Sequence, residues 1–363
     1  MVEITLRIAH YLNPTFIFYT NSYNRYRGKP YADDYNFKLN SSGFKDKEFT
    51  EKKENIYRII GIGDSFAYGG VPYEYNYLTL LESHLQRAGY NIEVLNMGIG
   101  AMGPKEYLSL FVSEGLNLKP DMLLLSFFVG NDFFDCLNSG RKWHSYSYTT
   151  SFIYYMITIW YKYEGVIVNS GEDYCDDCPS FDKKTYREIE GERSFVFIVK
   201  NELFAKSLDS ALYYLSSIND ICKKEHIEFV VVIIPDELQI DHILQNEVID
   251  TYYQKLNKSE WNITLPNTML SDRLQKLGVK SIDLYSSFST KSAERLYILR
   301  DTHWNIAGNQ LAANVIKEYI VSLIKREHQI SIQQRRVGGE VVPEGVSGKP
   351  YQPFNAPKLF LPR

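Results

Sequence analysis

The stretch that decides the fold is Tyr57-Arg-Ile-Ile-Gly-Ile-Gly63, which is followed at once by Asp64-Ser65-Phe66. A short apolar run that ends in glycine is typical of a strand buried on both faces. The polar residues after it would then lie at the carboxyl end of that strand. Ligands of open α/β sheets bind at this edge, so Ser65 is the first candidate for chemistry.

Apolar runs and stretches with helical spacing alternate along the chain after this strand. The further expected strands are residues 92–96, 121–128, 228–234 and 279–284, and the expected helices are 74–88, 104–114, 202–225, 236–258, 266–277 and 305–326. Strands that alternate with helices favour parallel pairing through right-handed crossovers. The sequence therefore predicts an α/β protein with a central, mostly parallel five-stranded sheet.

The same alternation divides the chain into parts. Residues 1–55 lack sustained periodicity and are expected to form an extended N-terminal arm. Residues 56–330 would form the α/β domain. An insertion at about 135–200 interrupts this domain, because the segment is too long for an ordinary connection. Residues 331–363 form a tail rich in glycine and proline, which is expected to lack a core.

Charge and hydropathy exclude some classes of protein. The 40 Lys and Arg residues against 44 Asp and Glu give a net charge of −4, whereas nucleic-acid binders normally show a basic patch. Lys162, Glu164 and Gly165 interrupt the most apolar long segment, 152–168, which falls short of the roughly 18 residues of a membrane span. We expect no nucleic-acid partner, no transmembrane segment and no signal peptide. The default compartment is the cytoplasm, association with the cell envelope is the alternative, and the oligomeric state stays open.

The cysteines do not predict a metal site. Four cysteines are too few for a disulfide scaffold in a chain of 363 residues. Cys175-Asp-Asp-Cys178 has the spacing of a metal knuckle, but a closed zinc site needs four ligands and the sequence has no second such motif. We interpret the motif as a loop pair that could form a local disulfide.

Groups suited to acyl transfer converge on one edge of the predicted sheet. The first strand ends in Gly63-Asp64-Ser65, the second in Asn96-Met-Gly-Ile-Gly-Ala-Met-Gly103, and the third in Gly130-Asn131-Asp132. Asp301-Thr-His303 stands just before the last helix. These blocks offer a nucleophile, a base, an orienting acid and donors for an oxyanion.

These blocks, in this order, resemble those of the SGNH (GDSL-type) hydrolase superfamily. Two longer stretches, Asn40-Ser-Ser-Gly-Phe-Lys-Asp46 and Leu299 to Ala313, resemble one bacterial branch of it. The resemblance covers about residues 40–325. It implies a flavodoxin-like three-layer α/β/α sandwich and hydrolysis of an ester without a cofactor or metal.

The role of each residue follows from its chemistry. Ser65 is a poor nucleophile until a base takes its proton. His303 is that base, because a neutral imidazole titrates near pH 7, and Asp301 would hold it. The resemblance implies three donors for the oxyanion: the Ser65 backbone N–H, an N–H of the turn after the second strand, and the Asn131 side chain.

Two positions depart from the family pattern. The second block usually supplies its N–H from a glycine, and here Ala101 aligns with it. Ala101 can serve if its φ is negative, and Gly100 is the alternative if the register slips by one residue. The family commonly spaces its pair as Asp-x-x-His, but Arg300 stands three residues before His303, so the pair is Asp301-x-His303. Followed by Trp304, it resembles the Asp-x-His-Trp motif of SGNH-like polysaccharide O-acetyltransferases.

The favoured function is a serine esterase that acts on a small-molecule or glycan O-acyl ester. The first alternative is an O-acyl(acetyl)transferase to a glycan hydroxyl, which Trp304 and the aromatic residues from Tyr146 to Tyr163 favour as a sugar platform. A remote alternative is a nucleotide-binding protein, because Gly98-Ile-Gly-Ala-Met-Gly103 matches GxGxxG. The insertion either shapes the substrate pocket or packs on the sheet edge as a brace.

Overall fold

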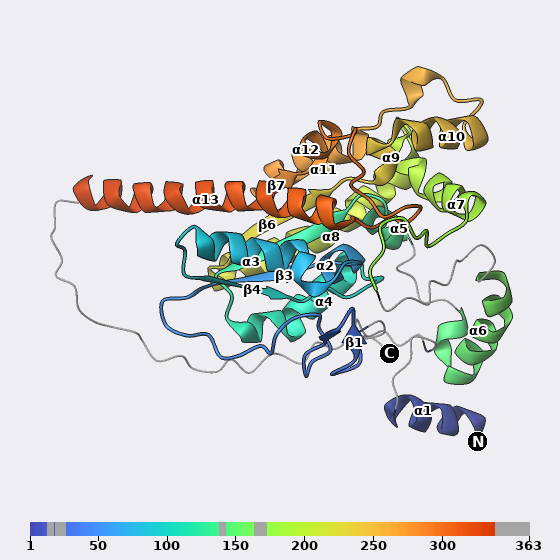
Figure 1. Cartoon of the computed structure of the whole chain (residues 1–363), viewed down its shortest axis with the longest axis horizontal. Helices are drawn as coiled ribbons and strands as arrows, with labels where there is room; N and C mark the ends of the chain where they lie inside the picture. Colours follow the sequence, from blue (N-terminus) through green and yellow to red (C-terminus); the bar gives the residue numbers. More distant parts are fainter. Residues whose placement is uncertain (13–17, 19–26, 138–142, 163–172, 338–363) are drawn as a thin grey trace. The chain divides into compact units, whose positions relative to one another are not determined.

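The central sheet is entirely parallel (Figure 1). The computed structural model describes residues 1–12, 18, 27–137, 143–162 and 173–337. The strands lie in the order β4 (Ile92–Asn96), β3 (Tyr57–Ile62), β5 (Met122–Phe128), β6 (Glu228–Ile234) and β7 (Lys280–Asp283). Each strand pairs in parallel with its neighbour. The predicted fold class is confirmed, and the carboxyl ends of the strands meet at one edge.

Helices cover one face of the sheet through a large apolar cluster. Ile60, Leu123 and Val231 of three neighbouring strands belong to the same cluster as Leu110 and Leu215. The helices on this face are α4 (Pro104–Ser113), α5 (Asp132–Leu137), α8 (Glu202–Glu225) and α11 (Leu265–Lys276). The side chains on the strands alternate between the two faces, so this cluster forms one of two layers of core.

The opposite face is covered by α3 (Tyr77–Arg87) and the beginning of α13 (Ile306–Val337). A Cβ atom at Gly61 would lie 2.6 Å from Leu78, which shows how closely α3 packs on the sheet. The Tyr77 N–H donates to Asn309 Oδ1 at 3.0 Å and joins the first turns of α3 and α13. The result is the three-layer α/β/α sandwich expected from the sequence.

The remaining short elements fill the connections. They are α2 (Ser65–Tyr68), η2 (Tyr73–Tyr75), η3 (Gly115–Leu118), α9 (Glu237–Ile240), α10 (His242–Tyr252), η6 (Lys258–Glu260) and α12 (Tyr285–Ser289). The helix expected over 236–258 is thus two helices, because Asp241 caps α10 by accepting from the N–H groups of Ile243 and Leu244.

The N-terminal 55 residues are not simply an extended arm. Residues 2–12 form α1 (Val2–Leu12), and β1 (Asp33–Asp34) pairs with β2 (Phe37–Lys38) in a small hairpin. Residues 39–46 include several side chains that are buried in the α/β domain, among them Phe44 and Lys45. The other predicted arm residues, 13–17 and 19–26, lie outside the described residues.

The insertion contains regular structure that its sequence did not reveal. It holds η4 (Trp143–Tyr146), α6 (Tyr148–Lys162), α7 (Lys183–Arg193) and η5 (Ser194–Phe197). The N-terminus of α6 is capped from α1, because Glu3 accepts from the N–H groups of Tyr148 at 3.0 Å and Thr149 at 2.8 Å. Residues 138–142 and 163–172 of the insertion lie outside the described residues.

The chain divides into two compact units, residues 1–319 and 320–363. The second unit begins within α13 and is helical to Val337. The predicted tail therefore starts as helix at 331–337, and its residues 338–363 lie outside the described residues. Among the helices that the structure describes, none is both long enough and apolar enough to cross a membrane.

Candidate active site

Ser65 stands at the carboxyl end of β3, in the first turn of α2. Asp64 is the N-cap of this helix, and its Oδ1 accepts from the Phe66 N–H at 2.9 Å. Such a cap fixes the backbone where the strand turns into the helix. Asp64 therefore supports the turn, and Ser65 is left partly exposed at the edge of the sheet.

Asp301 and His303 come from a tight loop before α13. Tyr297 and Trp304 pair across its base as an isolated antiparallel bridge. Trp304 is only 1% exposed. Its ring contacts the rings of Phe66, Tyr77 and Phe288. The idea that Trp304 offers a platform for sugar is therefore wrong, because this side chain anchors the loop in the core.

The structure brings the three predicted catalytic side chains into a linear array. His303 Nε2 lies 2.7 Å from Ser65 Oγ, and His303 Nδ1 lies 2.6 Å from Asp301 Oδ1. An ionised carboxylate only accepts, so Nδ1 carries the proton and Nε2 is free to accept from the serine hydroxyl. Asp301 Oδ1 also accepts from the His303 backbone N–H at 2.9 Å.

The charges of this array favour a base that works near neutral pH. Burial disfavours the imidazolium, but the Asp301 carboxylate outweighs that effect and raises the pKa of His303 above its ordinary value. Burial also disfavours the charged form of Asp301 and by itself would raise its pKa. His303 and the hydrogen bonds that Asp301 accepts outweigh this effect and lower the pKa to about 2. Asp301 thus stays ionised wherever the protein is folded at ordinary pH.

Asn131 directly precedes α5, in the short turn after β5, and lies near the serine turn. Burial raises the pKa of Asp64 to about 6, while the Phe66 N–H, His303, Arg193 and the Asn131 side-chain amide act in the opposite direction. Asn131 is partly exposed. Its side-chain amide is thus close enough to Asp64 to favour the ionised form of that buried carboxyl.

The turn after β4 approaches α2 very closely. A Cβ atom at Gly98 would lie 2.2 Å from the Tyr68 nitrogen, so only glycine fits there. A Cβ atom at Gly100 would lie 4.0 Å from the Ser65 Cβ, which places Gly100 beside the serine. Ala101 has φ +56°, so the condition of a negative φ is not met. Of the two candidate donors, Gly100 has the better position.

Residues 40–46 hold these turns in place, a role that the sequence did not reveal. Lys45 is 1% exposed. Its Nζ donates to Asp34 Oδ1 at 2.7 Å and to the carbonyls of Gly69 at 3.1 Å and Val71 at 2.8 Å. The buried Asp46 accepts from the Asn96 N–H at 2.7 Å. A Lys-Asp pair in a region without periodicity resembles a surface loop, so only the family resemblance could have singled it out.

The second half of the insertion also reaches the site. Ser180 Oγ donates to Asp301 Oδ2, and Arg193 donates to the Thr302 hydroxyl at 2.8 Å. Both contacts lie immediately before His303 in the chain. No pattern in the sequence predicts these contacts, because they depend on the path of a segment without periodicity.

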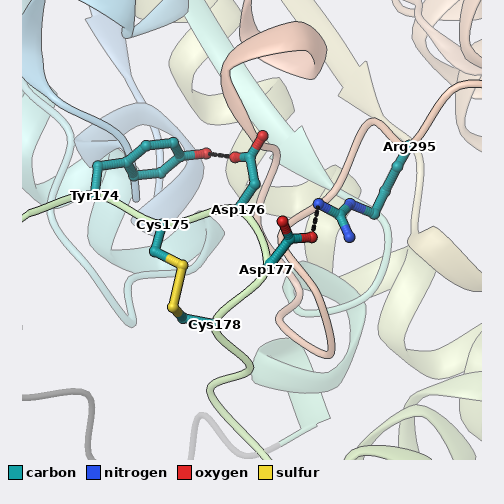
Figure 2. Close-up of a disulfide and its surroundings, with 6 residues drawn as sticks. All are labelled: Tyr174, Cys175, Asp176, Asp177, Cys178 and Arg295. Carbon is teal, nitrogen blue, oxygen red and sulfur yellow. Dashed lines mark hydrogen bonds and ion pairs between the residues drawn. A yellow bond between two sulfur atoms is a disulfide. The ribbon is translucent and has the colours of Figure 1, made fainter.

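The two remaining motifs of the sequence are structural. Cys175 and Cys178 form a disulfide (Figure 2), and the described residues hold no group of three or more side chains that could bind a metal. Two glycines of the GxGxxG match, Gly98 and Gly103, are in close contact with neighbouring helices of the protein. A Cβ atom at Gly103 would lie 2.9 Å from the Asp135 Cβ, just as Gly98 abuts α2.

A family comparison agrees with this geometry. Residues 198–346 match a family described as "SGNH hydrolase-like domain, acetyltransferase AlgX". The chain contains an SGNH hydrolase-like domain. The match spans less than half of the chain and includes Asp301 and His303 but not Ser65 or Asn131. Ser65 lies outside the match but is joined to it by the 2.7 Å contact between its Oγ and His303 Nε2.

Solved structures with a similar course of the chain include three esterases or lipases. An acetyl xylan esterase is 16% identical, over 73% of this chain and 100% of its own, with a TM-score of 0.42. A lipase/acylhydrolase from Enterococcus faecalis is 14% identical, over 73% and 95%, with a TM-score of 0.38. The esterase EstA from Pseudoalteromonas sp. is 10% identical, over 74% and 98%, with a TM-score of 0.42. No curated protein matches the chain.

Proposed function

We propose that the protein is a serine ester hydrolase that acts on an O-acyl ester through an acyl-enzyme. The observation that carries this proposal is the array in which Ser65 Oγ, His303 and Asp301 are joined by contacts of 2.7 and 2.6 Å. A serine, a histidine and a buried carboxylate in this geometry are the groups that acyl transfer requires.

In the first half of the reaction, Ser65 Oγ attacks the acyl carbon while His303 Nε2 takes its proton. Asp301 holds the imidazole and stabilises the imidazolium that forms. The tetrahedral intermediate collapses when the alcohol leaves with the proton from His303. The acyl group is then bonded to Ser65 Oγ. Water, activated by the same histidine, releases the acid and restores the serine.

The negative oxygen of the tetrahedral intermediate needs donors that are already in place. We assign this role to the Ser65 backbone N–H, the Gly100 backbone N–H and the Asn131 side-chain amide. Gly100 is preferred to Ala101 because it lies directly beside Ser65. All three would lie at the edge where β3, β4 and β5 end.

An O-acyltransferase is the second candidate. It shares the acyl-enzyme, but a sugar hydroxyl accepts the acyl group in place of water. The family description of the matched residues, which names an acetyltransferase, favours this reading. The two activities are distinguished by incubating the protein with an acetylated glycan, with and without an acceptor sugar. A transferase forms acetylated acceptor, whereas a hydrolase releases acetate at the same rate in both samples.

The substrate class and the compartment belong to the same proposal. The partner of the active site is a small-molecule or glycan ester. The Cys175–Cys178 disulfide supports the cell envelope over the cytoplasm, because disulfides persist in oxidising compartments and are rare in the cytosol. Alkylation of the free thiols in intact cells, followed by mass spectrometry, reports whether this pair is oxidised there.

The proposal is tested with Ser65→Ala. Esters of graded acyl chain length measure hydrolysis, and a fluorophosphonate reports the activated serine. The variant should lose both hydrolysis and labelling. Its melting temperature should stay within about a degree of the original, because substitutions at the surface usually change the free energy of unfolding by less than about 0.5 kcal/mol. Labelling that persists in Ser65→Ala would contradict the assignment.

A further inference from the structure

A small disulfide-closed loop of the insertion packs against the loop that carries the histidine. Cys175 and Cys178 close it (Figure 2). The carbonyl of Asp176 accepts from the Leu299 N–H at 3.1 Å. Asp177 Oδ1 accepts from Arg295 at 2.7 Å. The first contact joins the two backbones, so it fixes the course of one segment relative to the other.

This loop delivers Ser180 to the carboxylate of the triad. Ser180 follows the second cysteine by two residues, and its hydroxyl donates to Asp301 Oδ2. The other carboxylate oxygen, Oδ1, is the one that accepts from His303. Each oxygen of Asp301 therefore has its own donor, and rotation of the carboxyl group would break both hydrogen bonds.

The path to Ser180 is restricted on both sides. The disulfide removes conformations from the four-residue loop before it. Pro179 fixes its own φ and restricts Cys178. Beyond Ser180, α7 is held to the same histidine loop, because Arg193 donates to Thr302 at 2.8 Å. The serine hydroxyl thus meets Asp301 without a large loss of freedom at the moment of reaction.

We propose that Ser180 is a positioning residue that orients the Asp301 carboxylate for the reaction, and that the Cys175–Cys178 disulfide holds it there. The inference rests on the proposed function, since it concerns the same triad. It assigns a role to the insertion that neither its composition nor the family pattern supplies. The serine acts through Asp301 and does not touch the substrate.

The effect of Ser180 must be separated from that of the other groups around the triad. Asp64 of the serine turn, Arg193 of α7, Glu237 of α9 and Tyr35 of the small hairpin all interact electrostatically with Asp301 or His303. A change of pH alters several of them together. The test therefore relies on kcat and KM at one pH, where these groups keep one charge state.

The experiment compares Ser180→Ala with Ser180→Thr, which retains the hydroxyl. Ser289→Ala is the matched control, because its hydroxyl donates to the Ser286 carbonyl in α12, away from the triad. Because a hydrogen bond to a charged group is stronger than one between neutral groups, we expect Ser180→Ala to lower kcat about tenfold, with KM unchanged. Ser180→Thr should recover most of kcat, and Ser289→Ala should retain all of it. A Ser180→Ala enzyme with normal kcat overturns the inference.

A second variant separates positioning from general support of the fold. In the background Asp301→Ala, Ser180 has no side-chain acceptor at position 301, so Ser180→Ala should not slow fluorophosphonate labelling further. A further slowing would mean that Ser180 acts other than through Asp301. The double variant Cys175→Ser/Cys178→Ser should lower kcat by no more than Ser180→Ala does, again at constant KM. Unchanged kcat in that variant overturns the part assigned to the disulfide.

These outcomes are distinct from failure of the proposed function. Hydrolysis that depends on Ser65 but not on Ser180 overturns only this inference. Absence of ester hydrolysis, acyl transfer and serine labelling in the unaltered protein overturns the proposed function and this inference with it.

Discussion

Asp301 reaches His303 across a single residue because the backbone folds back between them. The Asp301 N–H donates to the Ile298 carbonyl at 3.1 Å, and the Ile298 N–H donates to the His303 carbonyl at 3.0 Å. Arg300, within this turn, has φ +47°. The left-handed residue turns the chain so that the Asp301 side chain and the His303 ring lie on the same side. The Asp-x-His spacing therefore allows the same carboxylate–imidazole contact as the commoner Asp-x-x-His spacing.

The raised pKa of His303 predicts the acid limb of the pH profile. The imidazole must be neutral to take the serine proton, and its pKa lies above the ordinary value of 6.5. Because protonation removes the base, kcat/KM should fall as the pH is lowered, with its midpoint above 6.5. Asp301 stays charged throughout, since its pKa is about 2. A profile that is flat from pH 5 to about 8 would contradict the role of His303.

Asn131→Ala tests the side-chain donor to the oxyanion. Loss of one such donor typically lowers kcat by about 10²–10³-fold, and KM should change little because the oxyanion forms only during the reaction. Steady-state kinetics on one ester measures both quantities. The amide also faces the buried Asp64, so thermal unfolding is followed in parallel. A large rise in KM at normal kcat would move Asn131 into substrate binding.

At the level of elements, residues 40–46 tie the small hairpin to the turns around the serine. Lys45→Met should remove the buried ammonium that joins Asp34 to the carbonyls of Gly69 and Val71. Removing one partner of a buried pair leaves the other groups unpaired, so we expect a loss of about 3 kcal/mol in the free energy of unfolding. Denaturant unfolding measures it. Lys47→Met is the control, because the Lys47 side chain is 72% exposed and its ion pair with Glu82 is long, at 3.9 Å. Equal stability of the two variants would show that the hairpin is not held in this way.

The sequence predicted the elements whose pattern is local. Strands such as 228–234 are continuous apolar runs, and their bounds agree with β6. Gly89, with φ +88°, follows the end of α3 as a glycine after a helix should. The start of α6, in the insertion, is different, because its N-terminal cap comes from Glu3, far away in the chain. No pattern within the segment could show that contact.

The same distinction holds for the active site. That Ser65, Asp301 and His303 lie together could be predicted, because Ser65 directly follows a strand set by its apolar run, and Asp301 and His303 stand just before a helix set by its periodicity. Ser180 and Lys45 could not, because their contacts are made by segments without a period, at ends of loops whose path depends on the whole fold. Trp304 was misread for a related reason. The sequence does not show whether an aromatic side chain next to His303 faces the substrate or, as here, the core.

For the whole molecule, the parallel sheet brings together residues from distant parts of the chain. Ser65 and His303 are 238 positions apart. We therefore expect refolding protein to regain ester hydrolysis no earlier than it buries Trp304. Stopped-flow fluorescence, with a Trp304→Phe variant to identify the signal, is compared with activity sampled at the same times. Hydrolysis that precedes burial of this ring would mean that the array forms before the histidine loop is anchored.

The long separation between serine and histidine also sets a time during synthesis. Ribosomes add about 5–20 residues per second, so the 238 positions correspond to about 10–50 s of translation. During that interval the growing chain carries its nucleophile but has not yet received its base. We therefore expect each new copy to be inert toward esters until residue 303 has been added. A ribosome that stalls short of residue 303 leaves a fragment with an unactivated serine.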